Sequence, residues 1–253
     1  MSDSVRAALA QIPGWESADF SEIEGSLTNR CWLLDVAGRK AVLKIDAQPR
    51  AEPFNARPAE AQVQTRAVER GIANPVLFVS DTLLLTEYVE GTVWSEGCLL
   101  VDENLDKLAA GMKTLHSMPL TGRTFDAVGA ARGYAQQIGK GDADTVRDCL
   151  ARVEAMPLPH NLCCCHNDMV AANIIYSPEV RFLDWEYACD NDPFFDIATV
   201  VAHHKLAPDR ADYLLNAYFD GDGDRWSDQL ARQTKFYDAL YWLWAAARLP
   251  AVS

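Results

Sequence analysis

The sequence predicts an α+β protein with two parts, a β-rich part over residues 1–90 and a mainly helical part over residues 91–253. Four short β-favouring runs and one helix-like run fill the first part. After the EGT turn at residues 90–92, apolar residues recur at helical spacing through most of the remaining chain. The length of 253 residues is sufficient for two lobes, each with a core of its own.

In the first part, CWLLDVAGRKAVLKI at residues 31–45 holds two β-favouring runs separated by AGRK, which predicts a hairpin. Pro58 opens a run with apolar residues at every fourth position, and Gly71 follows where the helix is expected to end. PVLFV and LLLTEYV, separated by SDT, predict a second pair of strands. The expected order is therefore strand, strand, helix, strand, strand.

The second part opens with VDENLDKLAAGMKTLHSM, whose acidic start and apolar spacing are typical of a helix. Further helices are expected over residues 126–138, 143–155, 194–205, 208–219 and 225–247. Three short β-like runs, LCCC, NIIY and VRFLD, lie among them. We therefore expect a helical part that carries a small β insert.

The charge balance limits the classes of partner. There are 36 acidic and 23 basic residues, so the net charge is −13, which repels nucleic acid and suits a cationic substrate. The amino terminus lacks a basic region followed by an apolar run, and the longest apolar run is far shorter than the ~18 residues that span a bilayer. These features predict a soluble, cytoplasmic protein without a membrane or nucleic-acid partner, and they do not indicate an oligomeric state.

The seven cysteines are expected to be reduced and structural. Three of them are adjacent, Cys163, Cys164 and Cys165. Neighbouring side chains on a strand point to opposite faces, so three adjacent cysteines do not easily converge on one metal ion. A short buried strand is the favoured interpretation of this run.

The residues that follow these cysteines carry the strongest chemical signal. His166 and Asp168 are followed by Asn173 five residues after the aspartate and by Asp184 beyond an expected hairpin, which is the spacing of the protein-kinase template. Phosphoryl transfer needs a carboxylate that orients the acceptor hydroxyl and takes its proton, a role that suits Asp168. It also needs hard oxygen ligands for Mg²⁺, which Asn173 and Asp184 would supply. The HND tripeptide alone is also compatible with ordinary turn chemistry, and the added spacing favours the catalytic interpretation.

Lys44 supports this interpretation from the first part of the chain. A lysine inside the apolar run AVLKI could protect an edge strand. In a kinase lobe, such a lysine contacts the α and β phosphates and is paired by a helical glutamate. Glu60 is the candidate partner, and Glu69 at the end of the same expected helix is the alternative.

CHNDMVAANII and FLDWEYACDNDPFFDIA resemble the motifs of the choline/ethanolamine kinase and aminoglycoside phosphotransferase family, and GSLTNRCWLL is similar to the nucleotide-covering loop of its choline kinase branch. The resemblance extends from about residue 20 to residue 205. It implies a protein-kinase-like bilobal fold and ATP-dependent, Mg²⁺-dependent transfer of phosphate to a small-molecule hydroxyl. By position, Asp168 would be the base, Asn173 and Asp184 the metal ligands, and Lys44 and Glu60 the phosphate-side pair.

The resemblance also implies which residues meet the rest of the nucleotide. The first loop has Gly25 where protein kinases have three glycines, so its side chains are expected to add hydrogen bonds to the phosphates. The side chains in question are those of Ser26, Thr28 and Asn29. The backbone of the hinge, Glu87, Tyr88 and Val89, would meet the adenine ring.

The acceptor is expected to be cationic. Tyr237, Tyr241 and Trp244 share one face of the last expected helix, which suits either a pocket for quaternary ammonium or plain core. The resemblance pairs such aromatics with the glutamate after the second motif, here Glu186. Choline or a related amino alcohol is the preferred acceptor. A thiamine kinase, an aminoglycoside or sugar phosphotransferase, and a catalytically inactive binding protein remain as alternatives.

Overall fold

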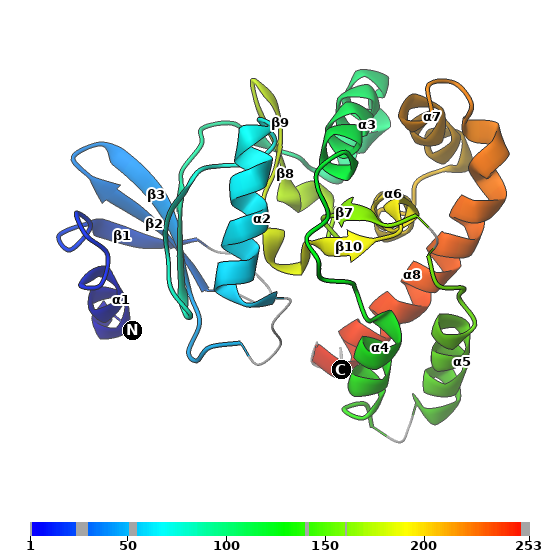
Figure 1. The fold of residues 1–253 in the computed structure, drawn as a ribbon, viewed down its shortest axis with the longest axis horizontal. Helices are drawn as coiled ribbons and strands as arrows, with labels where there is room; N and C mark the ends of the chain where they lie inside the picture. Colours follow the sequence, from blue (N-terminus) through cyan, green and yellow to red (C-terminus); the bar gives the residue numbers. More distant parts are fainter. Residues whose placement is uncertain (1, 24–29, 51–54, 140–141, 160, 249–253) are drawn as a thin grey trace. The chain divides into compact units, whose positions relative to one another are not determined.

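The structure is a computed structural model that describes residues 2–23, 30–50, 55–139, 142–159 and 161–248 (Figure 1). Its contacts divide the chain into two compact units. The first unit comprises Met1–Val93 and Asn173–Ala188, and the second comprises Trp94–Ala172 and Cys189–Ser253. The sequence suggests one boundary near residue 91, whereas the contacts also assign residues 173–188 to the first unit.

The first unit is built on an antiparallel five-stranded sheet in the order β1-β2-β3-β5-β4. The predicted hairpin is present, and Ala37 and Gly38 form its turn with φ values of 53° and 85°. Positive φ at both turn residues matches the right-handed twist of the flanking strands. The strands are β1 (Asp19–Ile23), β2 (Arg30–Val36), β3 (Arg39–Ile45), β4 (Val76–Val79) and β5 (Leu83–Glu87).

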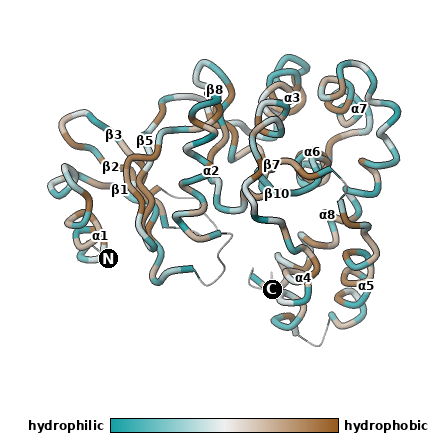
Figure 2. Tube along the Cα trace, in the orientation of Figure 1, coloured by the Kyte–Doolittle hydropathy of each residue, from teal (hydrophilic) through white to brown (hydrophobic). Residues whose placement is uncertain are grey.

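Helix α1 (Ser2–Leu9), which was not predicted from the sequence, covers one face of this sheet. Trp32 and Leu34 on β2 and Leu43 on β3 point to that face because alternate residues of a strand share a side. They form one buried cluster with Leu9 of the helix. The strands of the sheet are accordingly among the most hydrophobic segments in Figure 2.

The remainder of the first unit contains helix α2 (Arg57–Glu69) and a small three-stranded sheet in the order β6-β8-β9. The backbone N–H of Phe182 on β9 donates to the carbonyl of Ile72 at 2.8 Å, which joins this sheet to the segment after α2. The short 3₁₀ turn η5 (Trp185–Tyr187) packs against α2. The strands are β6 (Thr92–Val93), β8 (Ile174–Ser177) and β9 (Glu179–Phe182).

In the part of the second unit that the structure describes, the β structure consists of the antiparallel pair of β7 and β10 and an isolated parallel bridge between Thr124 and Asp190, and the other regular elements are helices. Helix α8 packs against α4, α5 and α6, and α3 packs against α7. All six helices that the sequence predicts for this part are present, with ends that differ by a few residues. The elements are α3 (Asp102–His116), α4 (Ala127–Ala135), α5 (Ala143–Glu154), β7 (Cys163–Cys165), β10 (Cys189–Asn191), α6 (Pro193–His203), α7 (Pro208–Tyr218) and α8 (Ser227–Arg248).

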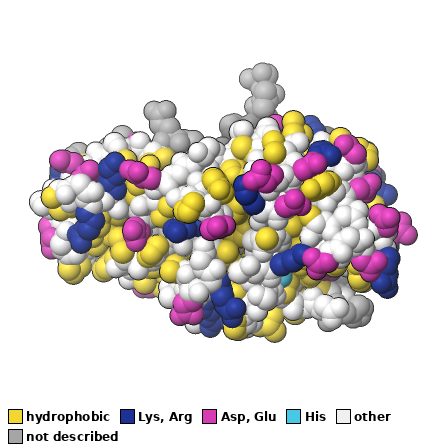
Figure 3. Space-filling model, turned by 90° about the horizontal axis from the view of Figure 1, so that it is seen from above, with side chains coloured by type: hydrophobic (Ala, Val, Ile, Leu, Met, Phe, Trp, Pro, Cys, Tyr) yellow, Lys and Arg dark blue, Asp and Glu magenta, His cyan; other side chains and the backbone are white. Residues whose placement is uncertain are grey.

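Within the described residues, every helix is too short or too polar to span a bilayer. Acidic and basic side chains are interspersed on the face shown in Figure 3, so the excess of 13 negative charges is not gathered into one patch of that face.

The buried cluster under α1 should make the stability of the first unit sensitive to truncation of its side chains. Leu43 is fully buried, so Leu43→Ala should lower the free energy of unfolding by about 2–5 kcal/mol, the range for large-to-small core changes. Leu77→Ala is the matched control, because Leu77 is 44% exposed and its loss should change stability by less than about 0.5 kcal/mol. Urea unfolding measures both, and equal effects would contradict the assignment of this core.

Candidate active site

Lys44 lies at the centre of an ion cluster in the first unit. Its Nζ is 2.7 Å from Glu60 Oε1 on α2 and 2.7 Å from Asp184 Oδ1, which follows β9. Burial by itself would lower the pKa of Lys44, but the carboxylates of Asp184 and Glu60 more than offset it and the pKa is raised. The lysine therefore stays positively charged in a nearly buried position. Three residues predicted for the site are thus in direct contact.

Glu60 is held from its other side by a second cation. Arg57, which has no solvent exposure, donates from Nη1 to Glu60 Oε2 at 2.6 Å. Its guanidinium also makes a two-pronged contact with the carboxylate of Asp46, with both distances at 2.8 Å. Bidentate pairing fixes the plane of the guanidinium and hence the direction of the Glu60 carboxylate. The alternative partner Glu69 is exposed at the end of α2, while Glu60 contacts Lys44.

Asn173 and Asp184 are held by the β8–β9 hairpin. Leu183 donates its backbone N–H to the carbonyl of Asn173 at 2.8 Å, so the residue next to Asp184 is tied to Asn173. Asp184 has a φ of 59° and a ψ of 68°, in the left-handed region that non-glycine residues rarely occupy. The donor set of one amide oxygen and one carboxylate consists of hard oxygen ligands, which fits Mg²⁺.

Glu186 lies in the turn immediately after Asp184 and is buried. Its Oε2 is 2.6 Å from Nη1 of Arg50, and Arg50 also contacts the carboxylate of Asp46. The negative charge of Glu186 is therefore compensated within the first unit. A cation that approached this carboxylate would compete with the guanidinium of Arg50.

The hinge residues Glu87, Tyr88 and Val89 follow β5. The backbone N–H groups of Glu87 and Tyr88 donate to the carbonyls of Pro75 at 2.8 Å and Lys40 at 3.2 Å. The predicted loop residues Ser26, Thr28 and Asn29 lie outside the described residues.

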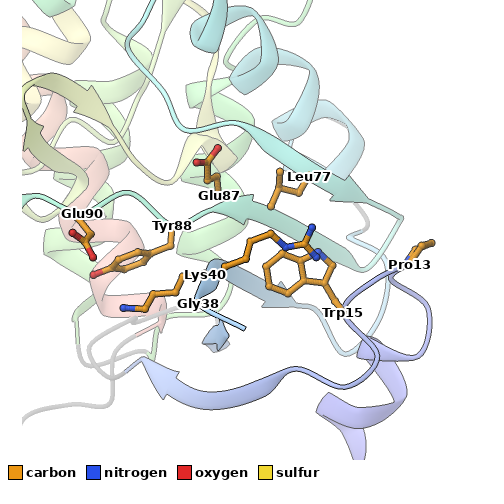
Figure 4. Close-up of a pocket in the computed structure, with 9 residues that line it drawn as sticks. Pro13, Trp15, Gly38, Lys40, Leu77, Glu87, Tyr88 and Glu90 are labelled. Carbon is orange, nitrogen blue, oxygen red and sulfur yellow. The ribbon is translucent and has the colours of Figure 1, made fainter. Parts of the chain in front are cut away.

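A pocket adjoins the hinge, and Figure 4 shows Trp15, Lys40, Glu87 and Tyr88 around it. Glu87 pairs with Ala41, whose side chain belongs to the core beneath α1. Lys44 pairs with Leu84, three residues from Glu87, and so lies on the opposite face of the sheet. Trp15, which lines the pocket, belongs to the core beneath α1, so this part of the pocket lies on the α1 side of the sheet.

In the second unit, the loop that carries Asp168 is anchored by Asp196. This fully buried carboxylate on α6 accepts from the backbone N–H of His166 at 2.9 Å and from that of Asn167 at 2.7 Å. Asn167 has a φ of 63°, so the two amides are held at a sharp bend directly before Asp168. The half-buried Asp168 follows this bend.

A second support of this loop is His204, at the end of α6. Its Nε2 accepts from the backbone N–H of Ala171 at 3.0 Å, so its proton is on Nδ1. Neither Asp196 nor His204 is among the predicted site residues. Both lie near the ends of an ordinary apolar helix, and the available signal for Asp196 was its place in the motif DPFFDIA.

The aromatic face of α8 forms a continuous stack. The ring centroids of Tyr237 and Tyr241 are 5.8 Å apart with 10° between the planes, and those of Tyr241 and Trp244 are 5.6 Å apart with 27° between the planes. Burial, and after it the charge of Asp168, raise the pKa of Tyr237, which shows that the buried end of the stack lies near the predicted base. Tyr241, the middle ring of the stack, is 37% exposed, and Trp244 at the other end is half-buried, so the stack reaches solvent beyond Tyr237.

Residues 19–243 match the model of the phosphotransferase enzyme family. Protein LicA of Haemophilus influenzae is 31% identical over 215 residues, which cover 80% of this chain and 63% of that protein. LicA of Haemophilus influenzae strain ATCC 51907 is 30% identical over 205 residues, covering 76% of each chain. This chain thus spans less than two thirds of the length of the first relative.

Solved structures share the fold. A choline/ethanolamine kinase family protein from Mesorhizobium loti has a TM-score of 0.72 at 24% identity, covering 98% of this chain and 86% of that one. Choline kinase LicA from Streptococcus pneumoniae has a TM-score of 0.75 at 17% identity, covering 97% and 90%. A structure of LicA in complex with AMP also has a TM-score of 0.75, at 18% identity, covering 97% and 89%. The predicted protein-kinase-like fold is confirmed.

The anchored loop makes stability depend on pH. Burial lowers the pKa of His204 and of its neighbour His203. An unfolded histidine titrates near about 6.5, so below that pH the unfolded chain holds more protons than the folded one and stability falls. The contribution is fully present above about 6.5 and is lost as the pH falls through the lowered folded-state value.

We expect His204→Gln to flatten this dependence, since glutamine can still accept a hydrogen bond but does not titrate. The free energy of unfolding, measured at about pH 7.5 and about pH 5.5, should fall less for the variant than for the parent chain. Identical pH slopes for the two proteins would contradict the role of this imidazole.

Proposed function

The chain belongs to the phosphotransferase enzyme family, as its motifs predict, and from this membership we propose that it transfers the γ-phosphate of ATP to the hydroxyl of a small cationic acceptor, with choline or a related amino alcohol preferred. The observation that carries the proposal is the cluster of Lys44, Glu60 and Asp184, a buried cation fixed between two carboxylates. The names of the similar proteins, choline kinase LicA among them, support the same substrate class.

On the nucleotide side, Lys44 holds the α and β phosphates, and the Glu60–Arg57 pair keeps its ammonium in place. A lysine restrained on two sides binds phosphate with little further loss of side-chain freedom. Asn173 and Asp184 hold Mg²⁺, which when bound neutralises charge on the β and γ phosphates. We place the adenine ring at the hinge, where the backbone of Val89 is the proposed donor.

On the acceptor side, Asp168 accepts a hydrogen bond from the acceptor hydroxyl and takes its proton as the new bond from oxygen to phosphorus forms. The bond to the leaving oxygen of ADP breaks in the same step. The two hydrogen bonds to Asp196 set the direction of the backbone directly before Asp168, so the carboxylate needs little rearrangement. Asp168 and the metal ligand Asn173 are only five residues apart in the chain.

The acceptor class follows from the stack on α8. A trimethylammonium group offers no ordinary N–H donor, so it is recognised by aromatic faces and nearby negative charge. Tyr241 and Trp244 supply the faces, and Asp168 supplies charge near Tyr237. Glu186 remains a candidate for a second charge, subject to its pair with Arg50.

The reaction is tested by Mg²⁺-dependent ADP release with choline, ethanolamine, thiamine, an aminoglycoside and an amino sugar. We expect the highest kcat/KM with choline. A preference for thiamine or an aminoglycoside would overturn the acceptor assignment. If neither turnover with any acceptor nor a thermal shift with Mg-ATP is observed, the proposal that the chain is an ATP-dependent phosphotransferase is refuted.

Asp168→Asn should reduce turnover by about 100-fold or more, because the amide cannot take the proton. Binding of Mg-ATP, followed as a shift in Tm, should be retained. Asp238→Asn is the control, because it removes one negative charge from an exposed position on α8 and should leave turnover unchanged. An Asp168→Asn enzyme with normal turnover would refute the assignment of the base.

Tyr241→Leu and Trp244→Leu should each raise the KM for choline by about tenfold, which corresponds to the loss of about 1.4 kcal/mol of cation–π attraction, while the KM for ATP stays unchanged. Trp242→Leu is the matched control, because Trp242 lies on another face of the same helix.

A neutral isostere of choline, 3,3-dimethylbutan-1-ol, should bind the parent chain less tightly than choline does. The substitution Trp244→Leu should lower the affinity for this isostere only slightly. A lower Tm with unchanged KM values in the two variants would instead identify the stack as core.

A further inference from the structure

His116, at the end of α3, is oriented by two hydrogen-bond partners. Its Nε2 is 3.0 Å from Oδ2 of the buried Asp196, and its Nδ1 is 2.7 Å from the hydroxyl of Tyr218. An ionised carboxylate can only accept, so the proton of the neutral imidazole is on Nε2. The Nδ1 atom therefore presents a lone pair, which in this structure meets the Tyr218 hydroxyl.

Two thiols lie beside this imidazole. Cys163 and Cys165 are two residues apart on β7, so their side chains share one face, whereas Cys164 points to the other. Their sulfur atoms are 3.5 Å apart. The two sulfurs and a ring nitrogen of His116 all lie within 4.8 Å of one another. The expected short strand is present, and on it only the alternate cysteines Cys163 and Cys165 face His116 together.

These distances match the requirements of a thiolate-bound metal. Two thiolates that bind one Zn²⁺ tetrahedrally at about 2.3 Å are about 3.8 Å apart, close to the observed separation of the two sulfurs. A metal-bound histidine commonly donates its other N–H to a carboxylate, and His116 does so to Asp196. The half-buried Cys163 gives access from solvent.

We propose that Nδ1 of His116 and the sulfurs of Cys163 and Cys165 form a binding site for a thiophilic divalent cation of the Zn²⁺ class, with water as the fourth ligand. On binding, the two thiols release their protons to solvent and the Tyr218 hydroxyl leaves Nδ1. The soft sulfur donors separate this site chemically from the all-oxygen pair of Asn173 and Asp184.

The position of the site connects it to the loop that carries Asp168. The same carboxylate of Asp196 accepts from His116 and from the backbone N–H groups of His166 and Asn167. A cation bound to His116 is thus linked through this histidine to Asp196, the residue that anchors the loop. It also ties α3 to β7, so binding should stabilise the second unit.

The test uses the full chain, freed of metal under reducing conditions and titrated with Co²⁺. We expect one Co²⁺ per chain, with a thiolate-to-cobalt charge-transfer absorption that Zn²⁺ abolishes and excess Mg²⁺ does not. Release of about two protons per Zn²⁺ and a rise in Tm should accompany binding. The readout needs no turnover, so it succeeds or fails independently of the proposed function.

Cys163→Ser should remove the charge-transfer band and raise the Kd for Zn²⁺ by more than about tenfold. Cys98→Ser and Cys149→Ser, at isolated cysteines of the same unit, are the controls and should retain both. Circular dichroism verifies that Cys163→Ser is folded, and His116→Gln provides an independent second loss of binding. A missing thiolate band in the parent chain, or a band that survives Cys163→Ser, would overturn the proposal.

Discussion

The first unit depends on the buried ion network around Lys44. Its ammonium joins the central sheet to α2 through Glu60 and to the β8–β9 hairpin through Asp184. Arg57 and Asp46 extend the network behind Glu60. Loss of one partner of a buried ion pair costs roughly 3–5 kcal/mol, because the other charge is left uncompensated. The position of the Lys44 ammonium therefore depends on contacts from both α2 and the β8–β9 hairpin.

Asp196 has the corresponding role in the second unit, with one carboxylate instead of a chain of charges. It satisfies two buried backbone donors at the bend before Asp168 and also binds His116. The bend before Asp168 is thus held by a residue that has no direct part in the proposed chemistry.

Helices and strands whose apolar residues recur with a clear period were predictable from the sequence. The helices of the second part and the Arg39–Ile45 strand that carries Lys44 occur where their patterns indicate. Helix α1 was not predicted, because its eight residues are too few for a convincing period and its burial depends on a sheet formed later in the chain. The partners Arg57 and Asp46 were missed for a related reason. Arg57 is a charged residue at a helix start, a position that usually faces solvent, and Asp46 follows a strand. Only the tertiary fold buries Arg57 and brings Asp46 into contact with it.

The placement of residues 173–188 has a consequence for how the protein is made. The first unit is not a continuous piece of chain, since its second segment is synthesised only after Ala172. A nascent chain that ends at Val93 holds Lys44 and Glu60 but lacks Asp184, so the lysine has one of its two carboxylates. The amino-terminal unit cannot be completed during early synthesis, and its final assembly waits for a hairpin encoded eighty residues further along. Folding of the two units is thereby coupled through chain connectivity.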